Sequence, residues 1–213
     1  MTRVAALRTA LSPGLASWIA ACALAEGIGM TASAAASRAA AQLGDNLPAA
    51  LAIIVLGGLV EGSALGLLQG DWLGRRFAGM SRLAWFAVTV VIAGLGWAGA
   101  SLPGLGASSD GGEPPIALVL LGALALGAAM GALLGVAQAL VLRRVARHAW
   151  RWVGISALAW APAMAVIFGG AMLPDASWTT PAVILLGTAT GVVAGAVLGA
   201  ISGWLMPSVD RRH

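Results

Sequence analysis

Two glutamates, Glu26 and Glu61, lie in the middle of long apolar segments of the chain. A carboxyl group in apolar surroundings can hold and release a proton, or it can bind a cation. No arginine or histidine lies at a comparable depth in these segments. We therefore expect each carboxyl group to face protein or water, and the two to share a proton if they lie close together.

The elements that carry these glutamates are predicted to be membrane-spanning helices. Hydrophobic residues make up 60% of the 213 residues, charged residues make up 9%, and the mean hydropathy is +0.92. This composition excludes a soluble protein. Because about 20 helical residues cross the hydrocarbon of a bilayer, we expect one transmembrane domain over residues 1–213, with six helices near 14–37, 48–73, 83–102, 115–142, 152–172 and 180–206.

The arginines indicate how the chain is oriented. Eleven of the twelve lie in the terminal segments 1–13 and 207–213 or in the second and fourth loops, and only Arg38 lies on the other side. Since basic loops stay in the cytoplasm, we expect both termini to be cytoplasmic. The loop arginines could also bind anionic lipid head groups; the candidates are Arg75, Arg76, Arg143 and Arg144.

Glycines recur at every fourth position in the second, fourth and sixth predicted helices. Residues four apart share one helix face, and a face without side chains lets two helix backbones approach closely in lipid. We therefore interpret these faces as glycine zippers that pack helices together. Their members are Gly58, Gly62, Gly66 and Gly70, then Gly127, Gly131 and Gly135, and finally Gly187, Gly191, Gly195, Gly199 and Gly203.

The three glycine faces belong to a longer repeat. Aligning residues 62–70, 131–139 and 195–203 brings three polar residues into register, and each of the other three helices begins near a tryptophan 67 residues from the next. This spacing predicts three tandem helical hairpins, with units near 14–73, 83–142 and 152–206. All units enter the membrane in the same direction, so we expect a pseudo-threefold axis along the membrane normal.

The aligned polar residues are expected to form hydrogen bonds between neighbouring helices, because polar side chains act in this way within a membrane. They are Gln69, Gln138 and Ser202, and the aligned tryptophans are Trp18, Trp85 and Trp152.

Glu26 and Glu61 break the repeat. The aligned residues are Ala93 and Trp160 for Glu26, and Met130 and Ala194 for Glu61. Two interpretations follow. The pair could form a single site that handles protons or cations, or each glutamate could be a protonated carboxyl that forms a hydrogen bond with a backbone carbonyl or with Gln69.

Signatures of other functions are missing from the sequence. It contains no metalloprotease, P-loop or serine-nucleophile motif, and its histidines, His148 and His213, lie outside any cluster. Cys22 is the single cysteine. We therefore expect no enzyme, no cofactor and no metal site. Nucleic-acid binding is not expected either, since topology accounts for the basic charge.

Two runs, GALLGVAQALVLRR (131–144) and RWVGISALAW (151–160), resemble a pattern in uncharacterised bacterial multi-pass membrane proteins. In that pattern a Gly-x3-Gly-x2-Gln helix runs into Leu-Arg-Arg and is followed by a helix that begins with tryptophan. In the first unit Asp71 departs from the pattern. The resemblance implies the topology and a bacterial cytoplasmic membrane, and it implies no activity.

Two functions remain open at this point. The sequence favours a structural or accessory protein, whose glycine faces pack within the chain, against a membrane-protein partner or against a second copy. The alternative is a small transporter or channel with Glu26 and Glu61 beside its path. The two differ in one feature, because a path requires a hydrated cavity along the axis whereas a packing protein closes that axis.

Overall fold

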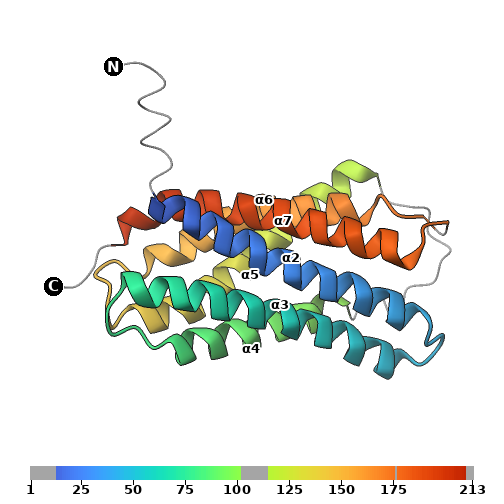
Figure 1. Cartoon of the computed structure of the whole chain (residues 1–213), viewed down its shortest axis with the longest axis horizontal. Helices are drawn as coiled ribbons and strands as arrows, with labels where there is room; N and C mark the ends of the chain where they lie inside the picture. Colours follow the sequence, from blue (N-terminus) through green and yellow to red (C-terminus); the bar gives the residue numbers. More distant parts are fainter. Residues whose placement is uncertain (1–12, 102–114, 176, 210–213) are drawn as a thin grey trace, which may run out of the picture.

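The computed structural model describes residues 13–101, 115–175 and 177–209. Within these residues the chain is helical, without a β-strand, and six helices are long and apolar enough to cross a membrane. They are α2 (Pro13–Ala41), α3 (Leu47–Arg76), α4 (Arg82–Ser101), α5 (Ile116–Leu142), α6 (Arg151–Ala171) and α7 (Thr180–Leu205), and the short 3-10 helix η2 (Met206–Ser208) follows (Figure 1). The predicted all-α architecture is confirmed.

The helix ends lie close to the predicted ones. The largest difference is in α2, which continues to Ala41 because the residues after 37 are arginine and alanines, which favour helix. Two helices begin with capping residues followed by a proline in the first turn. Asn46 accepts a hydrogen bond from the backbone N–H of Ala49, and Thr179 accepts one from Ala182. The predicted terminal segment 1–13 lies almost wholly outside the described residues.

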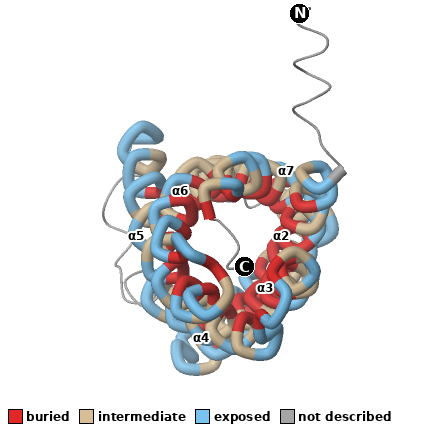
Figure 2. The backbone as a smooth tube through the Cα atoms, turned by 90° about the vertical axis from the view of Figure 1, so that its left-hand side faces the viewer, coloured by how far each residue is buried: buried red, intermediate tan, exposed pale blue. Residues whose placement is uncertain are grey.

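The helices form a closed ring in chain order. Figure 2 looks along the bundle and shows each helix beside the preceding and following ones, with α7 returning to lie beside α2. The α2–α7 pair shares the most extensive interface, and α4–α5 shares the smallest of the six neighbouring pairs. The first and last helices therefore close the ring.

The buried polar side chains lie inside the ring together with an apolar core, and many large apolar side chains cover its outer surface. Buried residues line the interior in Figure 2, and they include glutamates, glutamines, serines and threonines. On the outer surface Leu67, Leu95 and Leu185 are 60 to 70% exposed. An outer surface of exposed leucines is unlike that of a soluble bundle, and it fits helices surrounded by lipid.

Glycines lie where the backbones of neighbouring helices come closest. A Cβ atom added at Gly195 of α7 would lie 2.7 Å from the Cα of Ala23 in α2, and one at Gly199 would lie 2.8 Å from the Cα of Ile19. The glycines of α5 lie in the same way against α6, and those of α3 lie against α4. Each of these three contacts leaves no room for a methyl group.

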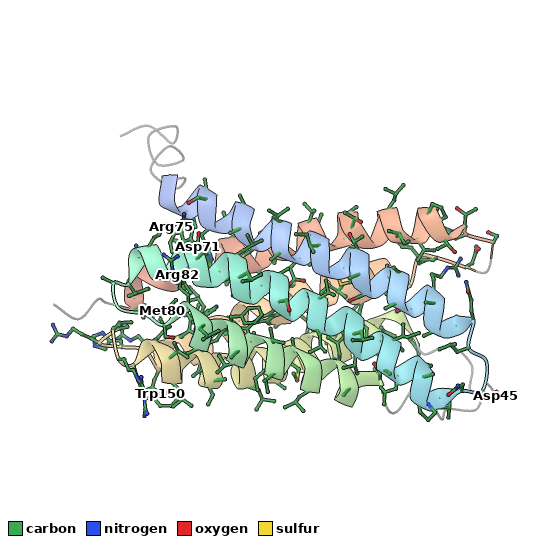
Figure 3. All side chains as sticks on the ribbon, turned by 60° about the horizontal axis from the view of Figure 1, so that its bottom comes forward. Asp45, Asp71, Arg75, Met80, Arg82 and Trp150 are labelled. Carbon is green, nitrogen blue, oxygen red and sulfur yellow. The ribbon has the colours of Figure 1, made fainter. Side chains whose placement is uncertain are left out.

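The two ends of the bundle differ in charge. The connections 77–81 and 143–150 lie at one end, which we call the arginine-rich end, and Figure 3 shows Arg75, Arg82 and Trp150 there with Asp45 at the opposite end. Asp71 pairs with Arg75 at 2.7 Å and with Arg82 at 2.9 Å. The exposed charge at this end is thus mainly basic.

The glycine contacts lead to a test with a matched control. Gly131→Ala would place a Cβ 2.7 Å from the carbonyl oxygen of Ser156, and we expect it to lower the free energy of unfolding by about 1–3 kcal/mol. Gly122→Ala in the same helix meets no atom within 4 Å and gains the same helix propensity. Unfolding of both variants in detergent, followed by circular dichroism, measures the difference; equal stabilities would contradict close packing at Gly131.

Candidate functional site

A cavity of about 690 Å³ occupies the half of the ring away from the arginine-rich end. All six helices contribute to its wall. Most of the lining side chains are apolar, and at the helix ends the lining includes exposed residues such as Ser37, Ala100 and Asp175. The cavity therefore runs from the middle of the bundle to its surface at that end.

Glu61 lies at the inner part of this cavity. It is 7% exposed, and its Oε2 accepts a hydrogen bond of 3.0 Å from the indole Nε1 of Trp97 in α4. A Cβ on Gly29 of α2 would lie 2.7 Å from the Cβ of Glu61, so this glycine makes room for the glutamate. Among the described residues no hydrogen bond is formed by Oε1, which leaves that oxygen for a ligand or a proton.

Glu26 lies deeper and outside the cavity wall. Both of its carboxyl oxygens are buried without a hydrogen-bond partner in the described part of the chain, and the residue is 1% exposed. It stands one helical turn from Met30, which lines the cavity, and one turn from Cys22, which belongs to the core at the arginine-rich end. The side chain of Glu61 packs against Gly29 of α2, three residues after Glu26, so the two predicted site residues lie on adjacent parts of α2 and α3.

Arg38 and Asp175 line the cavity near its outer end. Nη2 of Arg38 donates a hydrogen bond to the carbonyl oxygen of Trp178. Asp175 accepts hydrogen bonds from the hydroxyl and the backbone N–H of Ser177, which hold the pKa of Asp175 below its ordinary value. The outer end therefore carries a fixed cation and an ionised carboxylate, whereas the inner end carries Glu61.

The arginine-rich half of the ring is filled by side chains instead. Trp152 lies 6.3 Å from Trp18 and 5.8 Å from Trp85, measured between ring centroids. These three tryptophans belong to a buried core that also contains Leu73 and Phe77. The core closes the bundle at this end.

The three predicted polar residues lie around this tryptophan cluster. Gln138 donates to the hydroxyl of Thr89 at 3.0 Å and accepts from the indole of Trp152 at 2.7 Å. Ser202 accepts from Trp18 at 2.9 Å. Gln69 donates to the sulfur of Cys22 at 3.5 Å. Each of these residues is thus hydrogen-bonded to a neighbouring helix.

The four arginines predicted to contact lipid lie at the arginine-rich end. Arg75 is exposed and paired with Asp71, Arg76 is half-buried, and Arg143 and Arg144 are exposed. Their position fits the head-group region of a bilayer. Lipid binding itself stays a prediction.

Sequence reasoning missed most of the cavity wall. Trp97 lies twelve residues after Trp85, the same offset that separates Met30 from Trp18 and Met164 from Trp152, and all three residues line the cavity. The alignment of the three repeats could therefore have identified these three residues as occupants of equivalent positions. No sequence pattern pointed to the other polar residues of the wall, because their place depends on how the helices converge; these residues are Arg38, Ser33 and Asp175.

The fold and the distribution of side chains define the class of the protein. Six apolar helices with inward polar groups make a multi-pass membrane protein of the all-α class. A scan against models of protein families, a search of curated proteins and a search of solved structures each found no match to this chain. The resemblance to bacterial multi-pass proteins stays a prediction.

The hydrogen bonds of Gln138 lead to a second test. Gln138→Leu leaves the buried indole N–H of Trp152 without an acceptor, so we expect the free energy of unfolding to fall by about 1–3 kcal/mol. Ser63→Ala is the control, because the Ser63 hydroxyl donates only to Leu59 in its own helix; a change within about 0.5 kcal/mol is expected. Detergent unfolding compares the two, and a Gln138→Leu variant as stable as the parent would rule out a stabilising network.

Proposed function

We propose that the protein is a small membrane transporter, with a cavity open at the end opposite the arginines. The observation that carries the proposal is the cavity of about 690 Å³, lined by all six helices, that reaches Glu61. A ligand-sized cavity with few polar groups is the usual form of a binding site. The bundle is open at one end and closed by tryptophans at the other. This arrangement suits a transporter that admits its ligand from one side of the membrane at a time.

The predicted threefold repeat belongs to this proposal. The glycines of α3 lie against α4, those of α5 against α6, and those of α7 against α2, so each glycine face meets the next helix around the ring. The tryptophans spaced by 67 residues meet inside the bundle. Both observations support three hairpins around a pseudo-threefold axis along the membrane normal.

The arginine-rich end is proposed to face the bacterial cytoplasm, which follows from the positive-inside rule. The cavity would then open to the outer side. In this orientation Glu61 is reached from outside, and Glu26 lies between it and the tryptophan cluster. The pair fits a site that takes up a proton or a cation from the outer side, as intramembrane carboxyl groups in transporters do.

The structural or accessory role remains a second proposal. It is supported by the close contacts of glycines such as Gly131 and Gly195, which would serve as glycine zippers. In that role the cavity would be a packing defect filled by lipid, and a partner protein or a second copy would cover the outer face. The cavity favours transport, because a wall that combines Glu61, Ser33 and Arg38 is more polar than packing requires.

Cysteine labelling in vesicles distinguishes the two roles. In a Cys22→Ser background, Ile92→Cys introduces a thiol into the cavity wall, and Val91→Cys introduces one on the adjacent outer face, where Val91 is 57% exposed. We expect a charged, membrane-impermeant thiol reagent to modify the Ile92→Cys variant from the side opposite the arginine-rich end. The Val91→Cys variant should stay unmodified, because its thiol faces lipid.

Equal labelling of the two variants, or labelling of neither, would contradict a water-accessible cavity. A third variant, Leu124→Cys, provides a further lipid-facing control in α5, where Leu124 is 38% exposed. Cys22 is the single cysteine of the chain, so the background carries no competing thiol.

A further inference from the structure

We propose that the cavity binds a monovalent organic cation with an apolar body, whose charge lies against Glu61 and the indole ring of Trp97. This inference rests on the proposed function, because it names the class of ligand for the same cavity. It is carried by the charge at the inner end, the aromatic ring beside that charge and the apolar wall around both.

The inner end of the cavity has a carboxyl group and no cation to pair with it. The ionisable side chains in the described wall are Glu61, Arg38 and Asp175, and the last two lie near the outer end. Arg38 is held there by its hydrogen bond to Trp178. A buried carboxylate without a partner is costly, so Glu61 requires a proton or a cationic ligand when the cavity is occupied.

Trp97 favours an organic cation over a metal ion. Its N–H donates to Oε2 of Glu61, so the ring stands directly beside the carboxyl group. The face of an indole attracts a positive charge, most strongly where water is excluded. No group of three histidine, cysteine, aspartate or glutamate side chains that could hold a metal occurs among the described residues, and hard metal ions need several oxygen ligands.

The rest of the wall suits an apolar body of variable shape. Met30, Met130 and Met164 line the cavity together with Leu134 and Phe168. Methionine side chains are flexible and polarizable, and they adapt to differently shaped apolar groups. A cavity of about 690 Å³ lies within the range of about 300–1,000 Å³ that accommodates small organic ligands. Quaternary ammonium and phosphonium ions have the required combination of charge and apolar surface.

Cation binding should release a proton. Glu61 holds either its proton or the organic cation, so a cation that binds to the protonated protein displaces one proton to the solvent, and affinity for the cation rises with pH. The other groups that face this site are Glu26 from α2 and, along the wall, Arg38 and Asp175. Arg38 is permanently charged, and Asp175 has a lowered pKa, so neither changes charge near neutral pH.

The test compares tetraphenylphosphonium with tetraphenylborate, which has the same shape and the opposite charge. Isothermal titration of the purified full chain in detergent should show binding of the phosphonium and weaker or no binding of the borate. Glu61→Gln should weaken phosphonium binding by about tenfold or more and remove its pH dependence. Since glutamine is isosteric and keeps an acceptor for Trp97, this variant should remain folded, which circular dichroism checks.

Two further variants keep the test decisive. Arg38→Gln should bind the phosphonium at least as well as the parent, because a positive charge is removed from the wall. Glu26→Gln removes a neighbouring carboxyl group, so it should shift the pH dependence without abolishing it, because Glu61 is the carboxyl group that lines the inner part of the cavity. Preferred borate binding that is lost in Arg38→Gln would identify an anion site and overturn the proposal, and so would loss of the pH dependence in Glu26→Gln.

Phosphonium affinities that are equal in the parent and in Glu61→Gln would also overturn it. The labelling experiment at Ile92 then distinguishes failure of the transporter proposal from failure of the cation proposal. If the thiol reagent reaches the cavity but the phosphonium does not bind, the transporter proposal stands and the cation proposal fails. If the reagent does not reach the cavity, the proposed function fails, and the cation proposal fails with it.

Discussion

Direct contact between the backbones of α2 and α7 holds the ring closed, and the other features of the protein depend on it. Gly195 and Gly199 bring α7 so close to α2 that an added Cβ would lie under 3 Å from a neighbouring Cα. In lipid, where burial of apolar side chains gains little, such close approach supplies dispersion contacts. Without this closure the helices would form an open curved layer, and no cavity would be enclosed between them.

The two halves of the ring differ in what fills their interior. In the arginine-rich half, three tryptophans fill the interior, together with Ser202 and Gln138, which accept hydrogen bonds from two of them. In the other half the interior is hollow, and Glu61 lies near the boundary between the two. Small residues at the helix contacts serve both halves, because they bring the backbones together without occupying the interior. The large side chains then decide which part of the interior is filled.

Much of this architecture could be predicted from the sequence. Hydropathy placed the six helices, since the length of a spanning segment is set by the bilayer. Both glutamates were expected in the middle of apolar segments, and the structure places them on adjacent parts of α2 and α3. The cavity could not be predicted, because its volume depends on how six helices tilt and how Met30 and Met164 pack. For the same reason the hydrogen bond between Trp97 and Glu61 could not be predicted, although Trp97 occupies the position in its repeat that Met30 and Met164 occupy in theirs.

The extensive interface between α2 and α7 has a consequence for biosynthesis. Among the described helices α2 is made before α7, with four others between them, so α2 must wait for α7 before its most extensive interface can form. In the ring α2 contacts α3 and α7. Until α7 is inserted, α3 is the one of these two helices that can pack against α2. Insertion of α7 therefore completes the tertiary structure in a single late step, and a chain that stops before α7 lacks the partner that closes the ring.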